Sequence, residues 1–380
     1  MTHKDTFSNQ LSLLAQLPYR MGYYPEDSVV LAALHGRRHS QIGLVIRVDV
    51  KDFAHGAASR ALATNIVSHL RSDSAAAAFL ALYSAAHNPV LGQEPPELFG
   101  LGSQLCADAA LEELGSCYLW WVGPTAIGRL EQSGQLWRVA WITAREDLQY
   151  DPGAVQMVLE GKTVAPSRQS LVKLDTVSPE RRRSAARAAN RWRSQMSTDS
   201  TLRDSRREGG LQIWRELVNE NSVAPSALQC GKFAGAIADV TLRDAILLDM
   251  LGSSSVADLL LRETRRGETA GAAVTRRVSA ALGKLFDEGS GIGPPLEKFD
   301  HMVNILRAVA AHLPQRQRAE TFTLLCILFW WRGDGARANI YLDQALKINP
   351  SYSMAELMSQ ALTGGIAPGW VRRQRSRQPA

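Results

Sequence analysis

The strand-forming segments of this sequence all fall before about Thr176, and this asymmetry limits the folds that the chain can adopt. Apolar runs of strand length alternate there with two stretches of helical spacing, 57–70 and 103–114. The predicted strands cover residues 28–34, 42–50, 77–83, 117–122, 127–132 and 135–142. The order ββαβαβββ predicts a mixed sheet with helices packed on it rather than an all-parallel sheet.

Beyond Thr176 the hydrophobic spacing becomes helical. Predicted helices cover residues 179–196, 211–221, 226–239, 242–251, 255–266, 270–287, 297–312, 317–332, 335–348 and 353–363. Breaks rich in Ser, Gly and Arg at 197–210 and 289–295 are predicted to be loops or linkers. The predicted fold class is α+β, with an α/β domain containing a β-hairpin and a β-meander over 1–176, an arginine-rich helix and linker over 177–210, a helical domain over 211–371 and a basic tail over 372–380.

The last helices have a spacing close to that of a tetratricopeptide unit. The matching residues are Phe322, Leu325, Phe329, Ala338, Leu342, Ala345 and Pro350. Small residues on the second helix would let two antiparallel helices approach closely, and the proline would end that helix. Since only one unit matches, an ordinary helical hairpin is an equal alternative to a true repeat.

The net charge of +6 is concentrated in two arginine segments. Nine arginines stand against two aspartates between Arg181 and Arg207, and four more arginines follow between Arg372 and Arg377. Arginine outnumbers lysine throughout the chain, which lowers the weight of any one cluster as a nucleic-acid signal.

The four cysteines, Cys106, Cys117, Cys230 and Cys326, lie far apart without a C-x-x-C pair, which argues against a structural zinc site. The N-terminal residues contain only a short apolar patch, 11–17, which is no secretory signal. No uncharged apolar run reaches the roughly 20 residues of a membrane-spanning helix. We therefore expect a cytoplasmic protein without a bound metal or cofactor and without disulfides.

Four polar residues form a candidate ligand site where the first predicted hairpin begins. Asp27 and Ser28 precede the first strand, and Arg47 and Asp49 lie two apart on the second, so they project from one face. A carboxylate, a hydroxyl and a guanidinium together could bind a phosphate or position a substrate. The alternative is a solvated outer face on which Arg47 and Asp49 neutralise one another.

The first arginine segment is predicted to form an amphipathic helix. Ser178-Pro179-Glu180 is a favourable helix start, with a serine N-cap and an acid in the first turn. One face carries the apolar residues Ala185, Ala188, Ala189, Trp192 and Met196, and another carries Arg183, Arg187 and Arg191. Such a row can bind phosphate backbones or other anions. The alternative is a solvated face with acidic partners inside the protein.

The common catalytic signatures are missing, namely H-E-x-x-H, G-x-S-x-G and the G-x-x-x-x-G-K-[ST] loop. Gly289-Ser290-Gly291-Ile292-Gly293 resembles a phosphate loop, but no predicted strand precedes it and two prolines follow. Because a phosphate loop needs its strand–turn–helix context, we interpret this segment as a linker.

Residues 17–30 read LPYRMGYYPEDSVV. This segment resembles the opening signature of an actinobacterial family known only as domain of unknown function 4192. Further matching blocks are Arg47-Val48-Asp49, 134–138, 161–171, Leu242-Arg243-Asp244-Ala245 and 331–350. The chain departs from the family at Ile142-Thr143-Ala144, where members carry cysteines, so no cysteine or metal chemistry is transferred. The resemblance implies a fold but no activity.

Without a catalytic signature, the sequence favours a non-catalytic interaction or regulatory protein that binds a protein or an anionic ligand. One alternative is an enzyme that acts on a phosphorylated or anionic small molecule at Asp27, Ser28, Arg47 and Asp49. Another is a nucleic-acid-binding protein that uses the segment from Arg181 to Arg207. The sequence predicts neither the partner nor the oligomeric state.

Overall fold

The computed structural model describes residues 3–36, 39–54, 56–198, 200–219 and 224–377. The chain forms two compact units, Met1–Leu171 and Val172–Gln378. The sequence placed the corresponding change of character near residue 176. No described helix is both long enough and apolar enough to cross a bilayer.

The first unit contains the predicted mixed sheet, with strand order β2-β1-β3-β4-β5-β6. The strands are β1 Ser28–His35, β2 Gln41–Asp49, β3 Ala77–Tyr83, β4 Cys117–Val122, β5 Ala126–Ser133 and β6 Leu136–Ala144. Only β3 and β4 pair in parallel, because a helical crossover joins them; the other neighbours are antiparallel. The predicted fold class and strand segments are confirmed.

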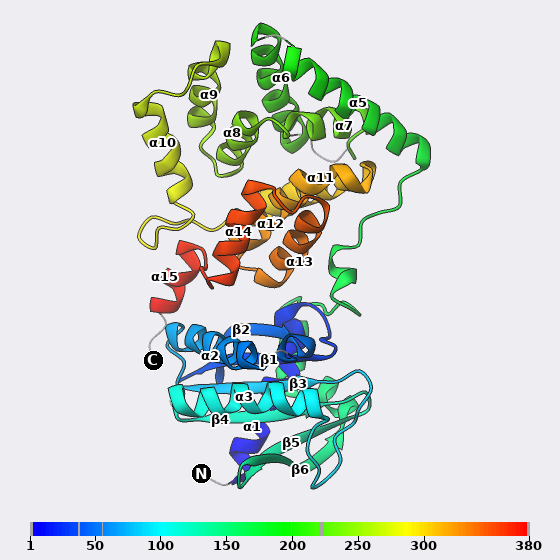
Figure 1. Ribbon diagram of the computed structural model, residues 1–380, viewed down its shortest axis with the longest axis vertical. Helices are drawn as coiled ribbons and strands as arrows, with labels where there is room; N and C mark the ends of the chain where they lie inside the picture. Colours follow the sequence, from blue (N-terminus) through cyan, green and yellow to red (C-terminus); the bar gives the residue numbers. More distant parts are fainter. Residues whose placement is uncertain (1–2, 37–38, 55, 199, 220–223, 378–380) are drawn as a thin grey trace. The chain divides into compact units, whose positions relative to one another are not determined.

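Helices cover both faces of this sheet. The helices α2 Ala57–Ser72 and α3 Glu97–Leu114 pack side by side on one face (Figure 1), against alternate residues such as Leu31 and Leu80. Helix α1 His3–Met21 covers the opposite face, where Trp120 Nε1 donates to Gln10 Oε1 at 3.2 Å. The strands β1 and β3 are therefore buried on both faces, which explains their uninterrupted apolar sequence.

Helix α1 was not predicted, and the predicted start of α3 lies too late in the sequence. Only the patch 11–17 of α1 is recognisable from the sequence, because Pro18 and the polar first turns obscure the helical pattern. Helix α3 begins at Glu97 rather than Ser103. Its Gly102, which reads as a helix breaker, is needed for packing, since a Cβ there would lie 2.9 Å from the Phe53 ring. Short elements complete the unit: η1 Val50–Phe53, η2 Arg145–Tyr150, α4 Pro152–Leu159 and η3 Gln169–Val172.

Every named element of the second unit is helical. The helices are α5 Pro179–Thr198, α6 Ser200–Asn219, α7 Ala227–Ala236, α8 Val240–Met250, α9 Ser254–Glu263, α10 Ala272–Gly283, α11 Leu296–His312, α12 Ala319–Arg332, α13 Gly335–Ile348, α14 Ser353–Thr363 and α15 Gly369–Arg377, with the 3-10 turns η4 Arg265–Gly267 and η5 Gln315–Gln317. The predicted hairpin is formed by α12 and α13. Its turn uses Gly333 at a φ of 85° and the N-cap Asp334, and Ala338 and Ala345 are buried between the helices. A tetratricopeptide relationship stays a prediction.

The prediction of a linker over 197–210 is wrong for residues 200–210, which belong to α6. The Ser-, Gly- and Arg-rich composition of this segment is typical of a loop, but two of its residues make contacts that stabilise a packed helix. Arg207 donates two hydrogen bonds, each 2.9 Å long, to the Asp239 carboxylate. At Gly210 a Cβ would lie 2.5 Å from the Leu242 side chain, so the glycine allows close helix packing.

The predicted basic tail is helical over 372–377 in α15, and 378–380 lie outside the described residues. The start of α15 holds the predicted loop at Gly289 to Gly293. Arg373 donates to the Gly289 carbonyl at 2.6 Å, and the Trp370 ring packs on Gly293, where a Cβ would lie 3.1 Å from it. This glycine-rich loop therefore has a structural role, because arginine and tryptophan side chains pack on it and fix it.

A close contact between α5 and α7 generates a stability prediction. A Cβ at Gly231 of α7 would lie 2.2 Å from the Ala185 carbonyl oxygen of α5. We expect Gly231→Ala to lower the free energy of unfolding by about 1–3 kcal/mol, since the helices would have to separate. Chemical denaturation measures the change.

The matched control for this substitution is Gly283→Ala at the end of α10, where the added methyl group meets no atom within 4 Å. This variant is expected to be neutral or stabilised by up to about 1 kcal/mol. Equal effects of the two substitutions would contradict the packing explanation.

Candidate ligand pocket

The opening motif, residues 17–30, runs from the end of α1 into the first strand. After α1 the chain forms a short bridge with a second family-like block: Tyr24 N–H donates to the Ala165 carbonyl at 3.3 Å, and Ala165 N–H donates to that of Gly22 at 2.8 Å. Gly22 adopts a φ of 78°, which suits glycine. The two segments that resembled the family at separate places in the sequence are therefore neighbours.

Asp27 fixes the end of the sheet at which this motif enters. Its φ is 40°, a left-handed conformation that aspartate tolerates better than most residues. Its carbonyl accepts from Val50 N–H at 3.0 Å, and its carboxylate Oδ1 accepts from Ala85 N–H at 3.0 Å. One residue thus joins the start of β1 to the segments that follow β2 and β3.

The four predicted site residues lie close together, and their polar groups are engaged differently. Ser28 pairs with Asp49 in the ladder and is fully buried, and its Oγ has no hydrogen-bond partner among the described residues. Arg47 donates to Asp49 at 2.6 Å and to the Glu26 carbonyl at 3.2 Å. No described residue is therefore placed to act as a general base for the Ser28 hydroxyl. The face that carries these residues is the one covered by α1, whereas Leu44, Ile46 and Val48 pack on the α2 and α3 side.

Asp27 generates a prediction about stability. Asp27→Ala removes the acceptor for Ala85 N–H, and alanine tolerates a positive φ less well than aspartate does. We therefore expect the free energy of unfolding to fall by about 1–2 kcal/mol. Asp27→Asn retains an acceptor and tolerates this φ, and should keep most of the stability. Urea denaturation of both variants tests the idea, which fails if the asparagine variant loses as much as the alanine variant.

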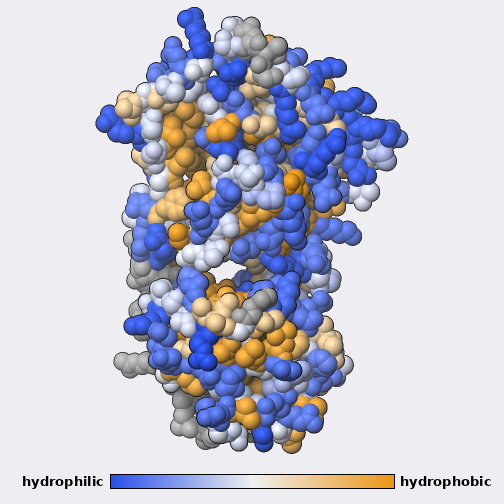
Figure 2. Space-filling view, viewed as in Figure 1, coloured by the Kyte–Doolittle hydropathy of each residue, from blue (hydrophilic) through white to orange (hydrophobic). Residues whose placement is uncertain are grey.

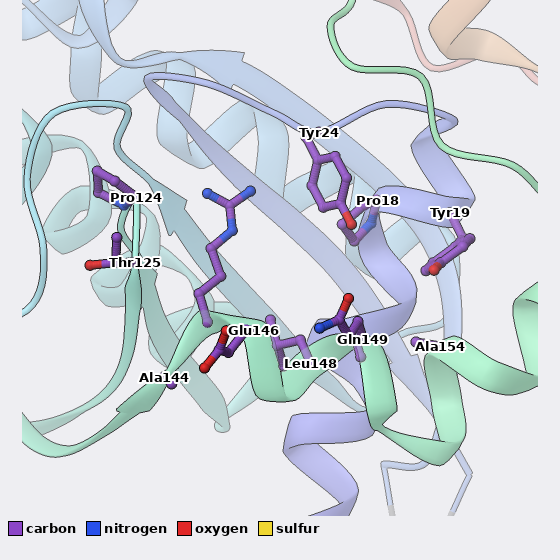
Figure 3. A pocket seen from close by; sticks show the side chains of 12 residues that line it. Pro18, Tyr19, Tyr24, Pro124, Thr125, Ala144, Glu146, Leu148, Gln149 and Ala154 are labelled. Atoms are coloured by element: carbon purple, nitrogen blue, oxygen red, sulfur yellow. The ribbon is translucent and has the colours of Figure 1, made fainter.

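A cavity of about 480 Å³ lies at the same end of the sheet. Strand register places the start of β1 and the ends of β3, β4 and β6 there. The opening motif forms one wall and the η2 segment the opposite wall, while the β4–β5 turn closes one end (Figure 3). Its lining residues are Ala15, Pro18, Tyr19, Tyr24, Pro124, Thr125, Ala144, Arg145, Glu146, Leu148, Gln149 and Ala154. We call this cavity the Arg145 pocket.

Arg145 is the cationic group of the pocket. It directly follows β6, donates from Nη1 to the Gly123 carbonyl at 3.2 Å and lies 5.3 Å from the centre of the Tyr24 ring. None of the described carboxylates forms an ion pair with it. A half-buried guanidinium held by a carbonyl and an aromatic ring keeps donors for a carboxylate or a phosphate.

Tyrosines supply the aromatic part of this site. Tyr19 and Tyr24 line the pocket, and Tyr83 is buried nearby at the end of β3. Burial raises the pKa of Tyr83; the Arg145 charge opposes this increase and Tyr24 adds to it. Burial, with a smaller contribution from Tyr24, also raises the pKa of Tyr19. Both phenols are therefore protonated at neutral pH and can donate hydrogen bonds.

The sequence did not indicate this pocket, apart from the opening motif that forms one wall. Arg145 and Glu146 lie in a stretch without a recognisable motif, and their proximity to Tyr24 depends on sheet pairing. The other predicted site residues, Arg183, Arg187 and Arg191, are exposed on α5 in the second unit, with Trp192 buried beneath them. Among the described residues, no group of three or more His, Cys, Asp or Glu side chains could hold a metal ion.

A buried cysteine–histidine contact in the second unit was also not predicted. Cys230 Sγ lies 3.6 Å from His312 Nδ1. That nitrogen is 2.7 Å from the Ala308 carbonyl, which can only accept, so Nδ1 carries the proton and cannot take one from the thiol. Burial raises the pKa of Cys230 to about 12. This arrangement does not activate a nucleophile.

The buried cysteines generate a reactivity prediction. Burial raises the pKa of Cys106 to about 12, as it does for Cys230, and it raises the pKa of Cys326 as well. In a Cys117→Ser variant, which removes the half-exposed thiol, we expect no reaction with a disulfide reagent at pH 8 until the protein unfolds. Three thiols should then react together. Reaction of any thiol with the reagent in the native variant would contradict the prediction.

Comparison with known proteins identifies the family of this chain. Residues 11–283 and 296–369 match the family described as Domain of unknown function (DUF4192). Because the match spans most of the sequence, the chain belongs to this family. The residues between the matched stretches include the loop at Gly289 to Gly293. No curated protein and no solved structure matches the chain.

Proposed function

We propose that this chain is a cytoplasmic, non-catalytic binding protein whose first unit takes an anionic small ligand in the Arg145 pocket. The observation that carries the proposal is a guanidinium at a cavity, without a carboxylate partner among the described residues. Arginines in folded proteins commonly pair with acids, and several arginines of this chain do so. A guanidinium that lines a cavity and has no carboxylate partner among the described residues is available to an anion from outside the chain.

The lining supports a ligand with a planar group next to its charge. A volume of about 480 Å³ lies within the range of small-molecule sites. Tyr19 and Tyr24 offer ring surfaces and hydroxyl donors, and Pro18 and Leu148 add apolar area. Glu146 also lines the pocket and would repel a second anionic group on the ligand. The expected ligand therefore has one carboxylate or phosphate attached to a ring system.

The same lining supports binding without turnover. Its residues include no histidine, cysteine or aspartate, and Glu146 is the one carboxylate among them. The Thr125 hydroxyl accepts from the Asn88 amide at 2.9 Å. A nucleophilic mechanism needs a hydroxyl or thiol next to a base, and the lining residues do not provide this pair.

Thermal-shift and calorimetric titrations test the proposal. The probes are adenosine 5′-monophosphate and indole-3-carboxylate, with adenosine and indole-3-carboxamide as their neutral analogues. We expect at least one charged probe to raise the Tm of the wild type while its neutral analogue does not. Arg145→Gln should weaken binding of that probe roughly 10- to 100-fold, as expected for the loss of a charged hydrogen bond.

The matched control is Arg60→Gln, which removes an exposed arginine from α2 on the other face of the sheet. Its affinity for the charged probe should equal that of the wild type. The proposal is wrong if neither charged probe binds, or if the Arg145 and Arg60 variants bind equally well.

Two alternatives stay predictions. An enzyme that uses Asp27, Ser28, Arg47 and Asp49 would need access to a serine that is fully buried here. A protein partner could bind the second unit through the α12–α13 hairpin. Neither alternative has an observation comparable to the Arg145 guanidinium, which lines a cavity and forms no ion pair with a described carboxylate.

A further inference from the structure

Helix α5 carries five exposed arginines, two in its first turn and three in a row on the face opposite its buried residues. Arg181, Arg182, Arg183, Arg187 and Arg191 are all exposed, and we call them the arginine face. Glu180, in the first turn, is the one acidic residue of this helix. Hydrophilic side chains gather over α5 on the side of the molecule shown in Figure 2. The helix thus presents a basic surface.

Little of this charge is neutralised within the described part of the chain. Arg183 lies 3.7 Å from Glu180, with both side chains mostly exposed, so the pair is weak. Arg187 and Arg191 form no ion pair with a described residue. Other arginines of this segment do have acidic partners: Arg193 lies 3.9 Å from Glu320, and Arg207 forms an ion pair with Asp239.

The helix is held rigidly by the opposite face. Ala185, Ala189 and Trp192 are buried, and α7 contacts them closely through Gly231 and Gly235. Successive members of the row Arg183, Arg187 and Arg191 are separated by about 6 Å along the helix axis. The charges therefore lie on a straight, preorganised element.

A nearby arginine extends the basic surface. Burial and the adjacent charge of Arg182 both lower the pKa of Arg318, which places two cations close together. The turn η5 that precedes Arg318 lies beside α5, because Gln317 donates to Asn190 Oδ1 at 2.9 Å. The positive potential therefore continues from α5 onto the start of α12.

The side chains that α5 exposes favour one class of anionic partner over the others. A membrane-surface helix inserts its apolar face into lipid, but the apolar face of α5 is buried in the protein. A protein partner usually buries apolar or aromatic anchors, and no large hydrophobic side chain is exposed on the described part of α5. Single-stranded nucleic acid is bound largely by stacking on aromatic rings, and Trp192 is buried. Phosphate contacts to a duplex need only the charges.

We infer that the arginine face of α5 binds the phosphate backbone of double-stranded nucleic acid, without base-specific contacts. The interaction is independent of the Arg145 pocket, which lies in the other unit. Its strength depends on counterion release, so affinity falls as salt increases.

Fluorescence anisotropy with the full-length chain tests this inference. The probes are labelled duplex DNA, duplex RNA and single-stranded DNA of one sequence, titrated between about 50 and 200 mM salt. The wild type should bind a duplex more tightly than the single strand. In Arg183→Ala/Arg187→Ala/Arg191→Ala, we expect roughly tenfold or greater weakening and a salt slope reduced by about 2.7, since each phosphate contact contributes about 0.9. The ratio of DNA to RNA affinity identifies which duplex is preferred.

The matched control is Arg262→Ala/Arg276→Ala/Arg277→Ala, which removes the same charge from exposed positions on α9 and α10. This variant should retain the wild-type affinity and salt slope. Circular dichroism should show the same Tm for both triple variants, because all six side chains are exposed. Absence of duplex binding at the lowest salt, tighter binding of the single strand, or equal losses in the two triple variants would overturn the inference. So would binding of phosphatidylserine vesicles without binding of a duplex.

Discussion

Burial of β1 and β3 on both faces is the constraint on which the first unit depends. With α1 on one side and α2 and α3 on the other, the middle of these strands excludes polar side chains. Polar and charged groups consequently collect where the strands end. Asp27 satisfies backbone groups at that edge, and the Arg145 pocket opens beside it. The same packing that stabilises the sheet thus determines where the Arg145 pocket lies.

Arginine has three distinct roles in this protein. Arg207 and Arg215 form ion pairs that join helices of the second unit. Arg373 donates to carbonyls of the loop at Gly289. Arg145 and the arginine face of α5 have no comparable acidic partners among the described residues. Residue type alone therefore does not identify a binding surface. The proposals for Arg145 and for the arginine face rest on the lack of comparable carboxylate partners among the described residues.

Sequence periodicity predicted the strands and most of the helices because each element shows its own spacing of apolar residues. It failed where packing overrides composition. In α6, the run rich in Ser, Gly and Arg is helical because Arg207 finds Asp239 and Gly210 lets α8 approach. In α1, the apolar patch is short, and the helix gains its stability from the sheet face that it covers. Such stabilisation comes from residues far away in the sequence.

The sequence by itself determined the family, the mixed sheet, the helical second half and the arginine row on one side of an amphipathic helix. These properties follow from local spacing and from motifs. Only the tertiary structure decided which charges lack a partner among the described residues, that Ser28 is buried, and that Arg145 lies against Tyr24. The physical reason is that pairing and burial depend on strand register and helix packing, which bring together residues more than a hundred positions apart.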